Sequence, residues 1–170
     1  MDVLLAVASK REIRDYASRA VPDDVERLIL EAGRVAGSSR NSQARRFVVV
    51  ADPDKRERLA DAVYAPGNIR GAALVVAIVA WGRGPTAFDV GRAAQNMMLA
   101  AWEQGVGSCP NGIADSDRAA RVLGLGDDER VVIVITFGYP ARARDPQRYS
   151  AAQWIARADR KSFEEVVQRL

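Results

Sequence analysis

The chain has 170 residues, 48% of them hydrophobic, and its 25 basic and 22 acidic residues leave a net charge of +3. A domain of this length buries roughly 70% of the surface that its unfolded chain exposes, so we expect a single domain over residues 1–170. The only cysteine, Cys109, excludes an internal disulfide. There is also no histidine, so we expect no metal site and no histidine acting as a general base.

The charge and hydropathy patterns also bear on the compartment and the partners. Basic and acidic residues are well mixed, which argues against nucleic-acid binding. The longest uncharged apolar run, residues 71–82, is too short to span a bilayer, so we expect no membrane contact. The opening stretch MDVLLAVASKREIR lacks the charged start and small-residue cleavage site of a signal peptide, and we therefore expect a cytoplasmic protein.

Helical and strand patterns alternate along the chain at short spacing, without repeats or low-complexity linkers. A short helix is expected near residues 3–7. A clearer one covers 21–37, with Pro22 near its start and Gly37 after its end. Further on, the pattern predicts a strand at 46–52, a helix at 52–64, a strand at 71–81, a helix at 86–105 and a strand at 129–140.

The helix expected at 86–105 is unusually apolar. Thr86 and Asp89 have the spacing of a capping box, and Gly105 marks the end. Between residues 93 and 102 most of the circumference is hydrophobic, so the helix must be covered on several sides. We favour a second copy of the chain as the cover. The alternative is a central helix enclosed by one chain.

Three polar segments remain once the apolar positions are assigned to the core. SKREIRDY holds Lys10, Arg11 and Arg14 close together, although such a run is often only a solvated face. SSRNSQ places Ser38, Ser39, Asn41 and Gln43 on a loop, where they could equally satisfy turn backbone.

The third segment, GVGSCPNGIAD, contains three glycines and Pro110. By itself it is typical of a loop in which backbone amides can approach a flat ligand closely.

Taken together and in this order, the segments KREIR, SSRNSQAR, AAQNMMLAAWEQGVGSC and PNGIAD resemble the motifs of the FMN-dependent nitroreductase family. The resemblance extends from about Ala6 to the tail RADRKSFEEVV. Two departures stand out. Glu12 occupies a position where the family usually has serine, and Ala44 with Arg45 replaces the usual Pro-Trp pair.

This resemblance implies an α+β fold with a mixed β-sheet flanked by helices, assembled as an intertwined homodimer with FMN at its interfaces. The polar loop would reach the FMN bound mainly by the other subunit. The basic motif would contact the ribityl, phosphate and pyrimidine parts, the turn would place a backbone N–H at flavin N5, and the tail arginines would hold the phosphate. The implied cofactor-binding residues are Lys10, Arg11, Arg14, Ser38, Ser39, Asn41, Gln43, Asn68, Pro110, Asn111, Gly112, Arg157 and Arg160.

The implied function is an NAD(P)H-dependent FMN oxidoreductase that passes hydride through flavin N5 to a small-molecule acceptor, such as a nitroaromatic or a quinone, in a ping-pong reaction. No catalytic side chain is required, because the flavin carries the chemistry. The alternative is a flavin-binding storage or sensing protein without turnover. A nucleic-acid binder is disfavoured, because Tyr149 and Trp154 are the only aromatic residues interleaved with the tail arginines.

Overall fold

Four strands form one sheet in the order β1-β2-β4-β3: β1 (Arg45–Val49), β2 (Leu74–Trp81), β3 (Gly107–Asn111) and β4 (Glu129–Gly138). This computed structural model describes all 170 residues. Every pair of neighbouring strands is antiparallel. The α+β class is confirmed, but parallel pairing, expected for a mixed sheet, is confined to an isolated bridge between Glu12 and Ser108.

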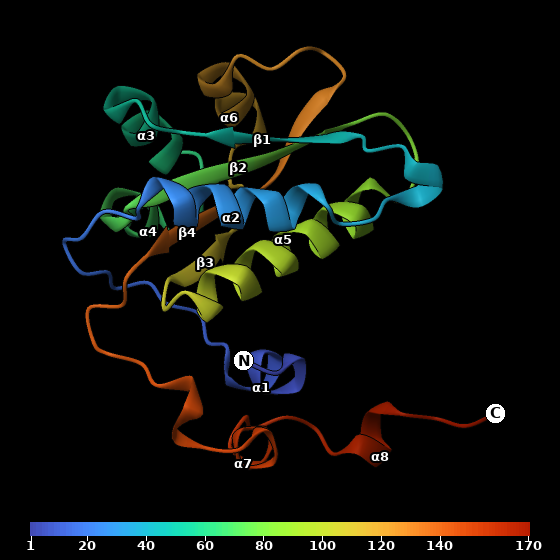
Figure 1. Ribbon diagram of the computed structural model, residues 1–170. Helices are drawn as coiled ribbons and strands as arrows, with labels where there is room; N and C mark the ends of the chain where they lie inside the picture. Colours follow the sequence, from blue (N-terminus) through green and yellow to red (C-terminus); the bar gives the residue numbers. More distant parts are fainter. The chain divides into compact units, whose positions relative to one another are not determined.

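The larger of two structural units, residues 11–144, contains this sheet between two layers of helices. Residues 74–80 of β2 are all buried, as expected for a strand whose two faces are both covered. On one face lie α2 (Asp23–Arg34) and α5 (Thr86–Glu103), and on the other α3 (Pro53–Ala60), α4 (Pro66–Gly71) and α6 (Ser116–Leu123) (Figure 1).

Helix α5 is covered within its own chain. Met97 and Ala101 are fully buried in a cluster with Ile29 of α2 and Val76 of β2. A Cβ atom on Gly33 would lie only 2.8 Å from Met97 Cγ, so glycine is what lets α2 approach α5 this closely. The hydrophobic circumference of this helix therefore needs no second chain to cover it, contrary to the interpretation that the sequence favoured.

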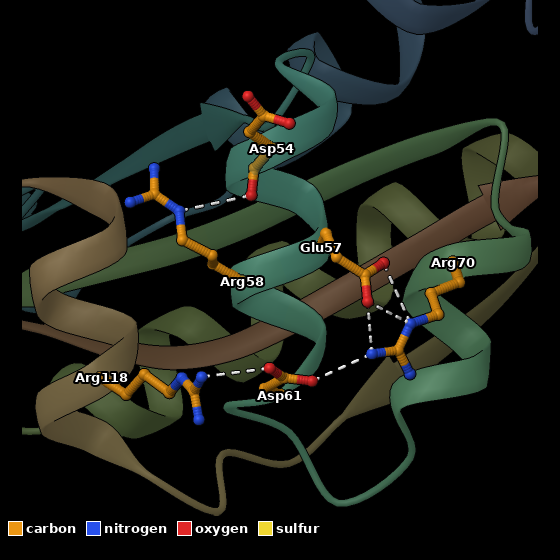
Figure 2. A network of polar contacts seen from close by, with 6 residues as sticks. All are labelled: Asp54, Glu57, Arg58, Asp61, Arg70 and Arg118. Atoms are coloured by element: carbon orange, nitrogen blue, oxygen red, sulfur yellow. Dashed lines mark hydrogen bonds and ion pairs between the residues drawn. The ribbon is translucent and has the colours of Figure 1, made fainter.

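The opposite layer is held by a second apolar cluster and by surface ion pairs. Arg70 of α4 contacts Glu57 and Asp61 at 2.6 and 2.9 Å, and Arg118 of α6 reaches Asp61 at 3.1 Å (Figure 2). These side chains are about half exposed, so we expect each pair to contribute less than about 1 kcal/mol.

The second unit comprises residues 1–10 and 145–170. It contains α1 (Val3–Ser9), η2 (Pro146–Arg148), α7 (Ala151–Ala156) and α8 (Phe163–Val166), and α1 contacts both η2 and α7. Ser150 and Gln153 form a complete capping box at the start of α7. No helix of the chain has the length and hydropathy that a membrane span requires.

Two local predictions were wrong. The segment around Pro110 contains the edge strand β3 rather than a loop. Proline is compatible with an edge strand because its missing N–H can face away from the neighbouring strand. Thr86 and Asp89 do not cap α5, whose N-cap is Pro85. Instead, Thr86 Oγ1 accepts a hydrogen bond from Arg130, and Asp89 accepts one from Ser39.

Candidate functional site

The basic segment Arg11–Arg14 runs along the outer edge of β3. Ile13 N–H donates to the Ser108 carbonyl at 2.9 Å, and Glu12 forms the parallel bridge to Ser108. Arg14 lines a cavity of about 160 Å³ between this segment and the chain after β4, together with Arg142 and Arg144. Glu12 and Asp15 contribute acidic groups to the same cavity, which leaves one net positive charge among the side chains that line it.

The turn Pro110–Gly112 continues from this edge. Because Ser108 directs its carbonyl away from β4, the alternation of a strand directs the backbone groups of Cys109 and Asn111 toward β4. Pro110 has no N–H to offer. Gly112 is exposed, its carbonyl accepts from Tyr64 N–H at 3.2 Å, and its own N–H makes no hydrogen bond. Of the three turn residues, Gly112 therefore holds the available backbone donor.

Asn68, from α4, lies directly behind this turn. Its Nδ2 donates to Asn111 Oδ1 at 2.7 Å, and the two residues are 9% and 3% exposed. The Asn111 amide in turn donates to the carbonyls of Cys109 and Val134 at 2.9 and 3.2 Å. The side chain of Asn111 thus points into the protein and is engaged there, while its backbone faces β4, so Asn111 supports the turn from behind.

Two further polar residues belong to this region and were missed from the sequence. Thr136 Oγ1 lies 3.3 Å from Asn111 Nδ2 and 2.9 Å from the Tyr16 hydroxyl, which also donates to the Ile13 carbonyl at 2.6 Å. Burial raises the pKa of Tyr16 well above its ordinary value. The available signal was Thr136 itself, a polar residue within the apolar run VVIVITF.

The polar loop Ser38–Gln43 has a constrained backbone. Arg40, Asn41 and Gln43 have φ angles of 51°, 54° and 51°, a region that residues other than glycine seldom occupy. Side chains help to hold the loop: Ser39 N–H donates to Asp89 Oδ2 at 3.0 Å, and Gln43 N–H donates to Ser38 Oγ at 2.9 Å. Within the loop, Asn41 N–H and Ser42 N–H donate to the carbonyls of Ser38 and Ser39, both at 3.0 Å.

Arg45 follows this loop, at one of the positions where the sequence departs from the family pattern. It is 9% exposed and donates to the Ala36 carbonyl just after α2, so it ties the two ends of the loop together. No hydrogen bond or ion pair joins residues 38–43 to the turn Pro110–Gly112 or to Arg11–Arg14 of the same chain.

The remaining predicted residues lie in the second unit. Lys10 follows α1 as its C-cap. Arg157 follows α7 and stacks over the Tyr149 ring, 4.3 Å from its centroid. Arg160 donates to the Ala158 carbonyl at 2.9 Å. The larger unit therefore brings together Arg11, Arg14, Asn68 and the turn Pro110–Gly112.

Comparison with known proteins identifies what this arrangement resembles. The model of the nitroreductase family matches residues 7–82 and 68–139. A provisionally named NADH dehydrogenase/NAD(P)H nitroreductase of Methanothermobacter thermautotrophicus is 31% identical, over 91% of this chain and 88% of that protein. The NADPH-flavin oxidoreductase of Vibrio harveyi is 28% identical, over 79% of this chain and 64% of its own length.

A solved structure extends the similarity to the whole chain. A provisionally named nitroreductase from Desulfovibrio desulfuricans, solved in complex with FMN, is 27% identical and covers 100% of this chain and 98% of its own, with a TM-score of 0.81.

Proposed function

Since the chain belongs to the nitroreductase family, we propose that it is an FMN-dependent oxidoreductase that uses NAD(P)H to reduce small-molecule acceptors such as nitroaromatics or quinones. The observation that carries this proposal is the free Gly112 N–H at the end of β3, beside the basic segment Arg11–Arg14. A backbone N–H can donate to flavin N5, and positive charge near the pyrimidine edge stabilises the reduced ring. The residues present fit both interactions.

Each group of residues would have a separate task. Gly112 N–H would donate to flavin N5, and Arg14 would lie at the pyrimidine edge, where its permanent charge stabilises negative charge on the ring. Lys10 and Arg11 would contact the ribityl and phosphate parts, and Arg157 and Arg160 would bind the phosphate, for which guanidinium groups are well suited. FMN, when bound, supplies hydride chemistry at N5.

The loop Ser38–Gln43 supports a homodimeric arrangement. Its residues Ser39, Asn41 and Gln43 are exposed, and the loop makes no polar contact with the flavin-binding residues of its own chain. We therefore propose that it serves the FMN of a second copy, in a dimer with two sites. NAD(P)H and the acceptor would use the same space in turn, as a ping-pong reaction requires.

The test begins with the visible spectrum of the purified chain after incubation with FMN. We expect one FMN per chain, rapid bleaching by NADPH or NADH under anaerobic conditions, and recovery of the absorbance when a quinone or nitroaromatic is added. A chain that binds no FMN would overturn the proposal. Binding without bleaching by either nicotinamide would instead indicate a storage or sensing protein.

A further inference from the structure

Four hydrogen bonds follow one another without a gap through the protein behind the proposed flavin site, and together they are called the hydrogen-bond series. Asn68 Nδ2 contacts Asn111 Oδ1 at 2.7 Å, and Asn111 Nδ2 contacts Thr136 Oγ1 at 3.3 Å. Thr136 Oγ1 contacts the Tyr16 hydroxyl at 2.9 Å, which contacts the Ile13 carbonyl at 2.6 Å. The hydrogen-bond series therefore joins α4, the turn Pro110–Gly112 and the basic segment Arg11–Arg14.

The donors in this series also have partners outside it. Asn68 donates to Asn111, whose own amide shares its two hydrogens among Thr136 Oγ1 and the carbonyls of Cys109 and Val134. The Thr136 hydroxyl lies within hydrogen-bond distance of both the Tyr16 hydroxyl and the Cys109 carbonyl, at 2.9 and 3.1 Å. Because the Ile13 carbonyl can only accept, the Tyr16 hydroxyl donates to it, and the hydrogen between Thr136 and Tyr16 then comes from Thr136.

Tyr16 is the residue that links Thr136 to the basic segment in this hydrogen-bond series. Its raised pKa keeps the hydroxyl protonated, so it remains a donor to Ile13. Its ring lies against Gly138, where a Cβ atom would be only 2.8 Å from Tyr16 Cδ1. The ring thus packs independently of the hydroxyl, and a phenylalanine at this position would keep that packing.

We propose that Tyr16 and Thr136 are positioning residues, which hold the segment Arg11–Arg14 and the turn Pro110–Gly112 at the spacing that one flavin ring requires. This inference rests on the proposed function. Neither side chain would touch the flavin. Tyr16 acts through the carbonyl of Ile13, next to Arg14, and Thr136 acts through the side chain of Asn111, next to Gly112.

The test compares three variants with a matched control. Thr136→Val removes the central hydroxyl with little change of shape, whereas Thr136→Ser retains it. Tyr16→Phe removes the hydroxyl that links Thr136 to the Ile13 carbonyl. Tyr139→Phe is the control, because it makes the same chemical change at a tyrosine whose hydroxyl has no hydrogen-bond partner and whose ring lies under Arg19. Affinity for FMN would be measured by fluorescence titration, and unfolding by urea would be followed in parallel.

We expect Thr136→Val and Tyr16→Phe to raise the dissociation constant for FMN about three- to tenfold, the equivalent of one hydrogen bond. In the double variant, the dissociation constant should rise by less than the product of the two single increases, because both substitutions interrupt the same hydrogen-bond series. Thr136→Ser should restore most of the affinity, and Tyr139→Phe should have no effect. In the FMN-free protein, Thr136→Val should shift the amide resonances of both Arg14 and Gly112, whereas Tyr139→Phe should shift neither.

A purely structural role predicts a different result. In that case Thr136→Val lowers the urea midpoint while the affinity for FMN and the Arg14 resonance stay as in the original chain, and the inference is overturned although the proposed function stands. If the unmodified chain itself fails to bind FMN, the proposed function falls, and the positioning role falls with it.

Discussion

The backbone N–H of Ser39 donates to the carboxylate of Asp89 at 3.0 Å, and this bond links the polar loop to the first turn of α5, 50 residues further along the chain. Asp89 is only 6% exposed, so the bond from Ser39 gives a hydrogen-bond partner to a side chain that is largely withdrawn from water. The constrained conformation of the loop is thereby attached to a rigid element of the core.

The first prediction concerns this bond. Asp89→Ala should lower the free energy of unfolding by about 1.5 to 3 kcal/mol, the range for a hydrogen bond to a charged group. Asp89→Asn keeps an acceptor for Ser39 N–H, so its free energy of unfolding should fall clearly less than that of Asp89→Ala. Urea denaturation of the FMN-free protein measures both. Equal stabilities for the two variants would show that the carboxylate does not hold the loop.

The second prediction separates the proposed roles of two arginines. Positive charge at the pyrimidine edge favours reduced over oxidised FMN, so Arg14→Gln should lower the midpoint potential. A loss of about 1.5 to 3 kcal/mol corresponds to roughly 30 to 65 mV for a two-electron couple. Arg157→Gln should weaken the binding of oxidised and reduced FMN about equally and leave the midpoint potential unchanged, because the phosphate charge does not change on reduction. Dye equilibration gives the potentials, and the reverse pattern would refute this placement of the flavin.

The third prediction is a dependence of stability on pH. Hydrogen bonds from Arg46, at 2.7 and 2.9 Å, and from Gly126 N–H lower the pKa of Glu129 to about 2. Because the folded-state pKa lies below that of the unfolded chain, this contribution is complete above about pH 4.5 and disappears as the pH falls toward 2. Thermal unfolding between these values should show a smaller acid-induced loss for Glu129→Gln than for the original chain. Parallel curves would contradict this.

The fourth prediction concerns assembly. If the loop Ser38–Gln43 completes the FMN site of a second copy, FMN must favour the dimer, and dilution must weaken FMN binding. Sedimentation velocity at several micromolar concentrations, with and without FMN, measures this linkage. A stable monomer that retains one FMN per chain would contradict it. Asn41→Gly removes the side chain but keeps a backbone that tolerates the φ of 54° at this position, so it should weaken FMN binding with little change in the unfolding of the FMN-free chain.

Much of the fold could be predicted because its signals are local. The run Leu74–Trp81 is apolar throughout, as a strand covered on both faces must be, the periodicity of α2 is strong, and α5 contains a long apolar stretch. The order of the polar motifs likewise indicated the family, which the family comparison confirms. These inferences need only residues that are close together in the sequence.

The two wrong local predictions concern segments whose structure depends on residues that are distant in the sequence. The spacing of Thr86 and Asp89 indicated a capping box, but Ser39 and Arg130 compete for the same oxygen atoms. Similarly, Pro110 and its flanking glycines are typical of a loop, yet pairing with β4 makes the segment a strand.

By itself, the sequence determined which residues carry charge, which must be buried and which segments could meet a flavin, because hydrophobicity, charge and backbone freedom belong to each residue. Only the tertiary structure decided that Asn68 holds Asn111, that Gly112 has the free N–H, and that Tyr16 and Thr136 connect the turn to the basic segment. Hydrogen bonds require atoms within about 3.5 Å in a favourable orientation, and for residues as far apart in the chain as Tyr16 and Thr136 folding alone creates that geometry.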